Sequence, residues 1–164
     1  MSFTQTPSRY RFSRASRLLK PSEFQAVFDA RKACRGQWLT LHRIEGPLAS
    51  STNDETETPE RLTQDATATR LGLIVAKRLV PAAARRNLIR RVVREYFRLN
   101  PAAFAPGDWI VRLHESPFPS PARIRKGAPV PTRLSIINGL RSDLSQVLKR
   151  IERQRMKETT DRDL

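Results

Sequence analysis

Arginine recurs every fourth residue along one segment of this chain, between Arg86 and Arg98. The cationic and amide residues of the segment are Arg86, Asn87, Arg90, Arg91, Arg94 and Arg98. Its apolar residues include Ile89, Val92, Val93 and Tyr96. In a helix this spacing places the two sets on opposite sides. Guanidinium groups form bidentate contacts with phosphate oxygens and stack on bases. The segment therefore predicts a helix that packs through one face and binds nucleic acid through the other.

The charge of the whole chain agrees with a polyanionic partner. The chain carries 31 Lys and Arg against 16 Asp and Glu, which gives a formal net charge of +15 at pH 7. Five of the acids lie within residues 46–69, a stretch rich in Ser, Thr and Pro that holds a single base. The remainder is more basic still, and such an excess of positive charge attracts nucleic acid from a distance.

Hydrophobic periodicity and turn residues predict the secondary structure. We expect helices from Pro21, with Ser22 as the N-cap, over the arginine segment as far as Asn100, and over 134–151. Strands are predicted over 37–44, 71–76 and 108–114, the first with Leu39 and Leu41 on one face and Trp38, Thr40 and His42 on the other. The order helix, strand, strand, helix, strand, helix favours an α/β (α+β) sandwich, in which helices pack around a small mixed sheet.

A chain of 164 residues and 18.8 kDa suits one domain. We expect a flexible basic arm over 1–16, a single RNA-binding domain over 17–155 and a polar, frayed tail over 156–164. Two loops interrupt the domain, an acidic and disordered one at 46–69 and an extended, Pro-rich and basic one at 116–131. No apolar run has the length of a signal peptide or a membrane span, so we expect a cytoplasmic protein.

The residue types of protein-based catalysis do not gather in this sequence. Cys34 is the one cysteine, so no internal disulfide can form, and we expect it to be a small half-buried residue. His42 and His114 lack Cys or carboxylate neighbours at metal-ligand spacing, and we expect them to satisfy local hydrogen bonds. No catalytic residue and no protein-built metal site are therefore assigned to this chain.

The arginine segment and the strand before it resemble the protein subunit of bacterial ribonuclease P. The signature of that family is a strand ending in a basic pair, a short spacer, and a helix that opens Arg-Asn-Arg-x-Lys-Arg-x-x-Arg-Glu. The matching residues here are Gly72, Val75, Lys77-Arg78, Arg86-Asn87-Leu88-Ile89-Arg90-Arg91-Val92-Val93-Arg94-Glu95 and Phe97-Arg98. The resemblance extends to Phe12, Arg17-Leu18 and 23–28, and covers most of residues 10 to 114.

The chain departs from this signature at two positions of the helix. Leu88 stands where the family has an arginine, so one RNA contact is missing or comes from a neighbour such as Arg85. Arg90 stands where the family has a lysine, which keeps the charge. The loops at 46–69 and 116–131 look like insertions relative to compact members of the family.

The resemblance implies a role in an RNA enzyme. In that family the RNA subunit, with bound Mg2+, hydrolyses precursor tRNA to free the mature 5′ end, while the protein binds the RNA and holds the 5′ leader. The residues that would contact the ribonuclease P RNA are Arg17, Lys77, Arg78, Arg86, Asn87, Arg90, Arg91, Arg94 and Arg98. The residues that would line the leader cleft are Phe24, Phe28 and Trp38. The resemblance also implies a left-handed crossover in the fold, which general rules disfavour, and no required protein oligomer.

Several alternatives stay open at this point. Phe24 and Phe28 could be an ordinary core pair at helical spacing, Trp38 a half-buried sheet residue, and Arg17 a structural cap. A ribosomal-type protein that binds structured RNA would share the charge and the basic helix but have no processing role. A DNA-binding module could place the same helix in a major groove. A stand-alone nuclease is disfavoured because metal-binding carboxylates do not cluster.

Overall fold

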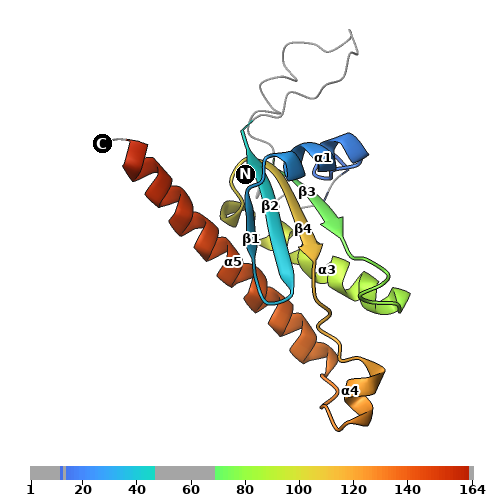
Figure 1. Cartoon of the computed structure of the whole chain (residues 1–164). Helices are drawn as coiled ribbons and strands as arrows, with labels where there is room; N and C mark the ends of the chain where they lie inside the picture. Colours follow the sequence, from blue (N-terminus) through green and yellow to red (C-terminus); the bar gives the residue numbers. More distant parts are fainter. Residues whose placement is uncertain (1–11, 13, 47–68, 163–164) are drawn as a thin grey trace, which may run out of the picture.

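The computed structural model describes residues 12, 14–46 and 69–162 (Figure 1). Most of the predicted basic arm at 1–16 and of the acidic loop at 46–69 lies outside these residues, as does the end of the tail. The described part forms a four-stranded sheet with helices on both faces, which confirms the predicted mixed α/β sandwich.

The sheet has the strand order β1-β2-β4-β3. Its strands are β1 (Ala33–Arg35), β2 (Leu39–Glu45), β3 (Thr69–Ile74) and β4 (Gly107–Leu113). The pairs β1–β2 and β2–β4 are antiparallel, while β3 runs parallel to β4. The sheet is therefore mixed, as predicted. Strand β1 could not be predicted, because three residues are too few to show an alternating pattern.

The helices are α1 (Pro21–Asp29), α3 (Ala83–Leu99), α4 (Pro121–Arg125) and α5 (Arg133–Arg162), with a short 3-10 turn at Pro101–Ala103. Helices α3 and α5 contact each other and cover one face of the sheet, whereas α1 packs on the other (Figure 1). Because α3 joins the parallel strands β3 and β4, it forms the crossover of the fold. The hand of that crossover stays an expectation from the resemblance.

Two apolar clusters lie on the two faces of the sheet. The larger cluster brings Leu39 and Leu41 of β2 together with Trp109 and Val111 of β4 and the buried sides of α3 and α5. The smaller one consists of Leu18, Val27 of α1 and Ile110 of β4. Adjacent residues of β4 thus serve opposite cores, which is why this central strand is almost continuously buried.

Three local predictions differ from the structure. Helix α1 has Lys20 as its N-cap, not Ser22, and the Glu23 carboxylate accepts hydrogen bonds from the amides of Leu19 (2.7 Å) and Lys20 (2.9 Å). The Pro-rich segment at 116–131 is not wholly extended, because Ser120 caps α4. Helix α5 continues to Arg162, well into the predicted tail, and residues 152–158 on the way are all good helix formers.

Helix α5 is joined to the start of β2 by one buried carboxylate. Asp143 accepts hydrogen bonds from the backbone amides of Gln37 (2.7 Å), Trp38 (2.9 Å) and Leu39 (3.0 Å). Its negative charge is balanced by these converging N–H dipoles, so the buried group is fully hydrogen-bonded. This contact fixes the β1–β2 turn against the helix.

Among the described residues, no helix is long and apolar enough to cross a membrane.

Candidate RNA interface

The structure confirms that the arginine segment forms a two-sided helix. Helix α3 buries Ile89, Val92, Val93 and Phe97 against the sheet and α5. Phe97, which the sequence analysis did not assign to the packed side, is more deeply buried than Tyr96. Asn87, Arg91 and Arg94 are exposed and Arg90 is half-buried. The cationic side chains are therefore available on the outer face of the helix.

Arg86 differs from the other arginines of the helix because it is tied to the backbone. Its guanidinium donates to the carbonyl oxygen of Val80 at 3.0 Å and to that of Pro81. The N-cap residue Ala82 offers no side-chain acceptor, so Arg86 and not a capping side chain holds the chain that enters α3. Arg86 is thus a structural residue at the beginning of the helix, whatever it contacts besides.

Arg94 lies at the centre of a cluster of positive charge. Partial burial, and then the charges of Arg17 and Arg90, lower the pKa of Arg94 below the ordinary value of arginine. In the described part of the chain, no carboxylate forms an ion pair with Arg90, Arg91 or Arg94. Like charges held together without a counter-ion attract a polyanion strongly.

Arg17 is held beside this helix by the segment that precedes α1. Its guanidinium lies 4.9 Å from the centroid of the Phe12 ring and donates to the Phe12 carbonyl at 3.1 Å. The Phe12 ring in turn meets Phe97 edge-on at 5.7 Å. The Leu18 amide donates to the Leu71 carbonyl at 3.2 Å, which attaches the segment to β3. Arg17 therefore has the structural contacts that the sequence analysis left open, and its charge still joins the cluster.

Arg98, at the other end of the helix, is paired with an acid. Its Nε donates to Glu95 at 3.3 Å, and a second guanidinium nitrogen contacts the other carboxylate oxygen. The hydrogen bond from Arg98 lowers the pKa of Glu95. This pair neutralises the last turn of α3, so the unneutralised charge is concentrated around Arg90 and Arg94.

Lys77 and Arg78 lie in the turn that follows β3 and precedes α3, and both are exposed. The turn is closed by the amides of Leu79 and Val80, which donate to the Ala76 carbonyl at 3.1 and 3.2 Å. Val80 is 1% exposed and anchors the turn in the core. The basic pair thus extends the positive surface beyond the N-terminal end of α3.

The opposite face of the sheet carries the predicted leader residues Phe24 and Phe28. Both are half-buried and pack against the smaller core. The Phe28 ring meets His42 of β2 edge-on, with centroids 4.8 Å apart. The two rings therefore have the packing role that was kept as an alternative, and neither residue is fully buried.

His42 and Arg112 add polar groups to this face. Burial, and then the charge of Arg112, lower the pKa of His42. Its Nε2 is buried and has no hydrogen-bond partner among the described residues, so the local hydrogen bond expected for this ring is absent at that atom. Arg112 is exposed on β4, on the same side as Ile110. Arg112 was not among the predicted site residues, although the alternation along 108–114 places it on the same face as Ile110.

An ion-pair network fixes α1 above the sheet. Arg70 of β3 donates two parallel hydrogen bonds to Asp108 of β4, at 2.8 and 2.6 Å, and a third to Glu23 of α1 at 2.7 Å. Burial alone would raise the pKa of Glu23, but the amides of Lys20 and Leu19, together with Arg70, outweigh it and lower that pKa. The side of α1 that carries Phe24 and Phe28 is thus held in a fixed position relative to the strands.

The structure does not place Trp38 on this face. A Cβ atom on Gly139 of α5 would lie 2.7 Å from the Trp38 ring, so the indole packs against α5 on the other side of the sheet. The expected alternation with Thr40 and His42 fails because Trp38 lies in the turn before β2, where Asp143 holds its amide. The predicted grouping of Trp38 with Phe24 and Phe28 on one face of the sheet was therefore wrong.

Two other sequence predictions concern reactive side chains. His114 satisfies a local hydrogen bond as expected, with Nδ1 2.9 Å from the Thr40 hydroxyl. Cys34 was expected to be half-buried, but it lies in β1 and is buried in the larger core. Over residues 12, 14–46 and 69–162, no three His, Cys, Asp or Glu side chains gather where they could hold a metal ion.

Comparisons with known proteins identify the family. The sequence model of the ribonuclease P family matches residues 12–125. The ribonuclease P protein component of Azoarcus sp. is 38% identical over 104 residues, which are 63% of this chain and 72% of the relative. That of Bordetella petrii is 34% identical over 105 residues, 64% of this chain and 75% of the relative.

Solved structures share the fold. The Staphylococcus aureus RNase P protein superposes with a TM-score of 0.54 at 24% identity, covering 83% of this chain and 94% of that one. The Thermotoga maritima protein gives a TM-score of 0.51 at 22% identity, covering 82% and 96%. The chain therefore belongs to the ribonuclease P protein family and serves in tRNA 5′ processing as the protein subunit of that ribonucleoprotein enzyme.

Proposed function

We propose that the outer face of α3 binds the RNA subunit of ribonuclease P while the sheet face under α1 holds the 5′ leader of precursor tRNA. The observation that carries the first part is the cluster of Arg17, Arg90 and Arg94, which no described carboxylate neutralises. Lys77, Arg78, Asn87 and Arg91 extend this surface, and Arg86 and Arg98 border it. Phosphates of a folded RNA are its natural counter-ions, because arginine binds phosphate oxygens in a bidentate manner.

The leader is assigned to the opposite face because its chemistry is that of a single-stranded RNA site. Such sites combine cations that follow the backbone with aromatic rings on which bases stack. Phe24 and Phe28 supply partly exposed rings, and Arg112 supplies a cation from β4. His42 adds a polar ring that packs against Phe28, and its buried Nε2 has no hydrogen-bond partner among the described residues.

Mg2+ belongs to the RNA subunit in this proposal. The described residues offer no cluster of oxygen or nitrogen ligands for it, whereas RNA phosphates are hard oxygen ligands of the kind Mg2+ prefers. The arginine face acts indirectly. By neutralising phosphates of the RNA subunit, it lets this RNA and its substrate assemble at a lower Mg2+ concentration than the RNA alone requires.

Affinity measurements on the reconstituted holoenzyme test this division. We would measure the dissociation constants of precursor tRNA and of mature tRNA for holoenzymes that contain the wild type, Phe28→Leu or Arg112→Gln. Both variants should lose affinity for the precursor but keep that for mature tRNA, since only the precursor has a leader. Arg153→Gln, an exposed substitution far along α5, is the matched control. Equal losses for both substrates would assign the face under α1 to another part of the complex.

A further inference from the structure

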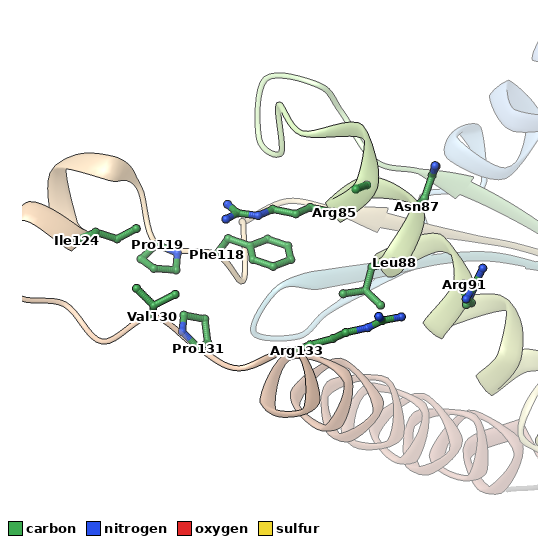
Figure 2. A pocket seen from close by; sticks show the side chains of 11 residues that line it. Arg85, Asn87, Leu88, Arg91, Phe118, Pro119, Ile124, Val130, Pro131 and Arg133 are labelled. Atoms are coloured by element: carbon green, nitrogen blue, oxygen red, sulfur yellow. The ribbon is translucent and has the colours of Figure 1, made fainter.

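A groove beside the arginine face contains residues that the proposed function has not used. It lies between the first turns of α3 and residues 118–133, which include α4 and the start of α5 (Figure 2). Its volume is about 460 Å³. The lining combines cations, an aromatic ring and aliphatic side chains, notably Arg85, Arg91, Arg133, Phe118, Leu88 and Val130.

Phe118 is held in place at the centre of this groove. Its amide donates to the Ser116 hydroxyl at 3.2 Å, and its ring packs against the main core. The guanidinium of Arg85 lies 4.8 Å from the ring centroid (Figure 2). This aromatic–guanidinium pair resembles the stacked surfaces on which proteins bind unpaired bases.

The walls of the groove are also fixed. Ser120 caps α4 on one side, where its hydroxyl accepts from the Arg123 amide at 3.3 Å. Thr132 caps α5 on the other side and accepts from the Ser135 amide at 3.1 Å. A binding site with a wall that two helix caps hold in place loses little entropy through the ordering of that wall when a ligand enters.

Leu88 gives the groove an apolar floor. It is half-buried and packs, like Phe118, against the main core, at the position where the family signature has an arginine. Val130, 65% exposed, and Ile124, 37% exposed, leave further apolar surface uncovered at the rim. The substitution that removes one cation from α3 thus creates an apolar surface beside the remaining arginines.

We propose that this groove binds one unpaired nucleotide of the RNA subunit, with the base against the Phe118–Arg85 pair and the phosphate near Arg91 and Arg133. The lining contains no acidic side chain, so its charge complements an anion. Its volume lies within the roughly 300–1,000 Å³ of small-ligand sites, which suits a single nucleotide. The occupant is the RNA subunit and not the leader, because Asn87 and Arg91 belong both to the groove and to the α3 face. This inference rests on the proposed function.

The first test measures the affinity of the full-length protein for a bacterial ribonuclease P RNA. Phe118→Leu keeps an apolar side chain but removes the stacking face, so the dissociation constant should rise roughly five- to a hundredfold. Arg133→Gln should raise it by a smaller factor and lower its dependence on salt. Arg153→Gln is the control, and circular dichroism checks that each variant is folded.

The second test locates the nucleotide. Cys34 is buried, so Val130→Cys introduces one accessible thiol at the rim for a photo-crosslinking label. Crosslinks should fall on a discrete unpaired position of the RNA subunit, and Arg153→Cys should not give them. Crosslinks to the leader of precursor tRNA, or to no RNA, would overturn the proposal.

The outcomes separate this inference from the proposed function. If Phe118→Leu and Arg133→Gln bind RNA like the wild type while Arg94→Ala binds weakly, the groove is not an RNA site and the α3 face remains one. If Arg94→Ala also binds like the wild type, both proposals are overturned.

Discussion

The Phe24 ring lies so close to Gly72 that a Cβ atom at position 72 would stand 2.6 Å from the ring's Cε1. The contact joins α1 to β3 on the face assigned to the leader. A glycine is required there by close approach, since no other residue leaves room for the ring. Gly72 belongs to the family signature and Phe24 to the matching segment 23–28, and their contact gives a physical reason for both.

Gly72→Ala should destabilise the protein by about 1–3 kcal/mol, because the added methyl group overpacks the contact with Phe24. Urea unfolding measures this change. Phe24→Leu in the same background should recover part of the loss, because leucine can vacate the space. If the stability losses of Gly72→Ala and Phe24→Leu simply add up in the double variant, the Phe24 ring does not determine the requirement for glycine.

Arg90→Ala and Arg94→Ala should each weaken binding to the RNA subunit. Each should also reduce the slope of log K against log salt by about 0.7–0.9 for every phosphate that the variant no longer neutralises. Arg98→Ala should have a smaller effect, because Glu95 already neutralises that side chain. Filter binding at several salt concentrations gives both quantities. A larger effect at Arg98 than at Arg94 would contradict the concentration of free charge around Arg94.

Asp143→Asn should cost on the order of 2–3 kcal/mol of stability. The amide side chain loses the charge that attracts the N–H groups of Gln37, Trp38 and Leu39, and it turns a donor toward one of them. Thermal unfolding beside the exposed Glu152→Gln variant measures the difference. If both variants melt together, Asp143 does not anchor the β1–β2 turn.

Stability should fall as the pH drops below about 6.5. Burial, and then Arg112, lower the pKa of His42, and burial, and then Arg35, lower that of His114. Below the unfolded value of 6.5 the unfolded chain takes up protons first, so acid favours unfolding until the folded-state pKa values are passed. His42→Gln should flatten the curve of unfolding free energy against pH in this range. An unchanged curve would show that His42 is not the responsible group.

The sequence was enough to predict the arginine helix, the core-facing residues Leu39 and Leu41 of β2, and the family. Each of these rests on local periodicity or on a run of consecutive residues. Residues far apart in the chain decided the failures. Trp38 does not lie on the face assigned to the leader, because its ring packs against Gly139 of α5, more than a hundred positions away in the sequence. The ion pair of Arg98 with Glu95 lies at helical spacing and could have been expected.

The groove at Phe118 also depends on contacts between residues far apart in the chain, which the sequence did not predict. Five prolines between 116 and 131 suggested an extended loop. The cap at Ser120 and the packing of Phe118 against α3 instead build a wall from that segment. The sequence of the loop alone could not predict that Phe118 meets Arg85 and Leu88 at one groove, because those two residues precede Phe118 by some thirty positions.

Cleavage of a 5′-extended precursor tRNA at low Mg2+ tests the central claim most directly. A bacterial ribonuclease P RNA would be assayed alone, with the wild-type protein, with Arg90→Ala/Arg94→Ala and with the control Arg153→Gln. The account predicts that the wild type and the control stimulate cleavage at the mature 5′ end, and that the double variant does so only when Mg2+ is raised. Equal stimulation by the double variant and the wild type at low Mg2+ would contradict the assignment of the arginine face of α3 to the catalytic RNA.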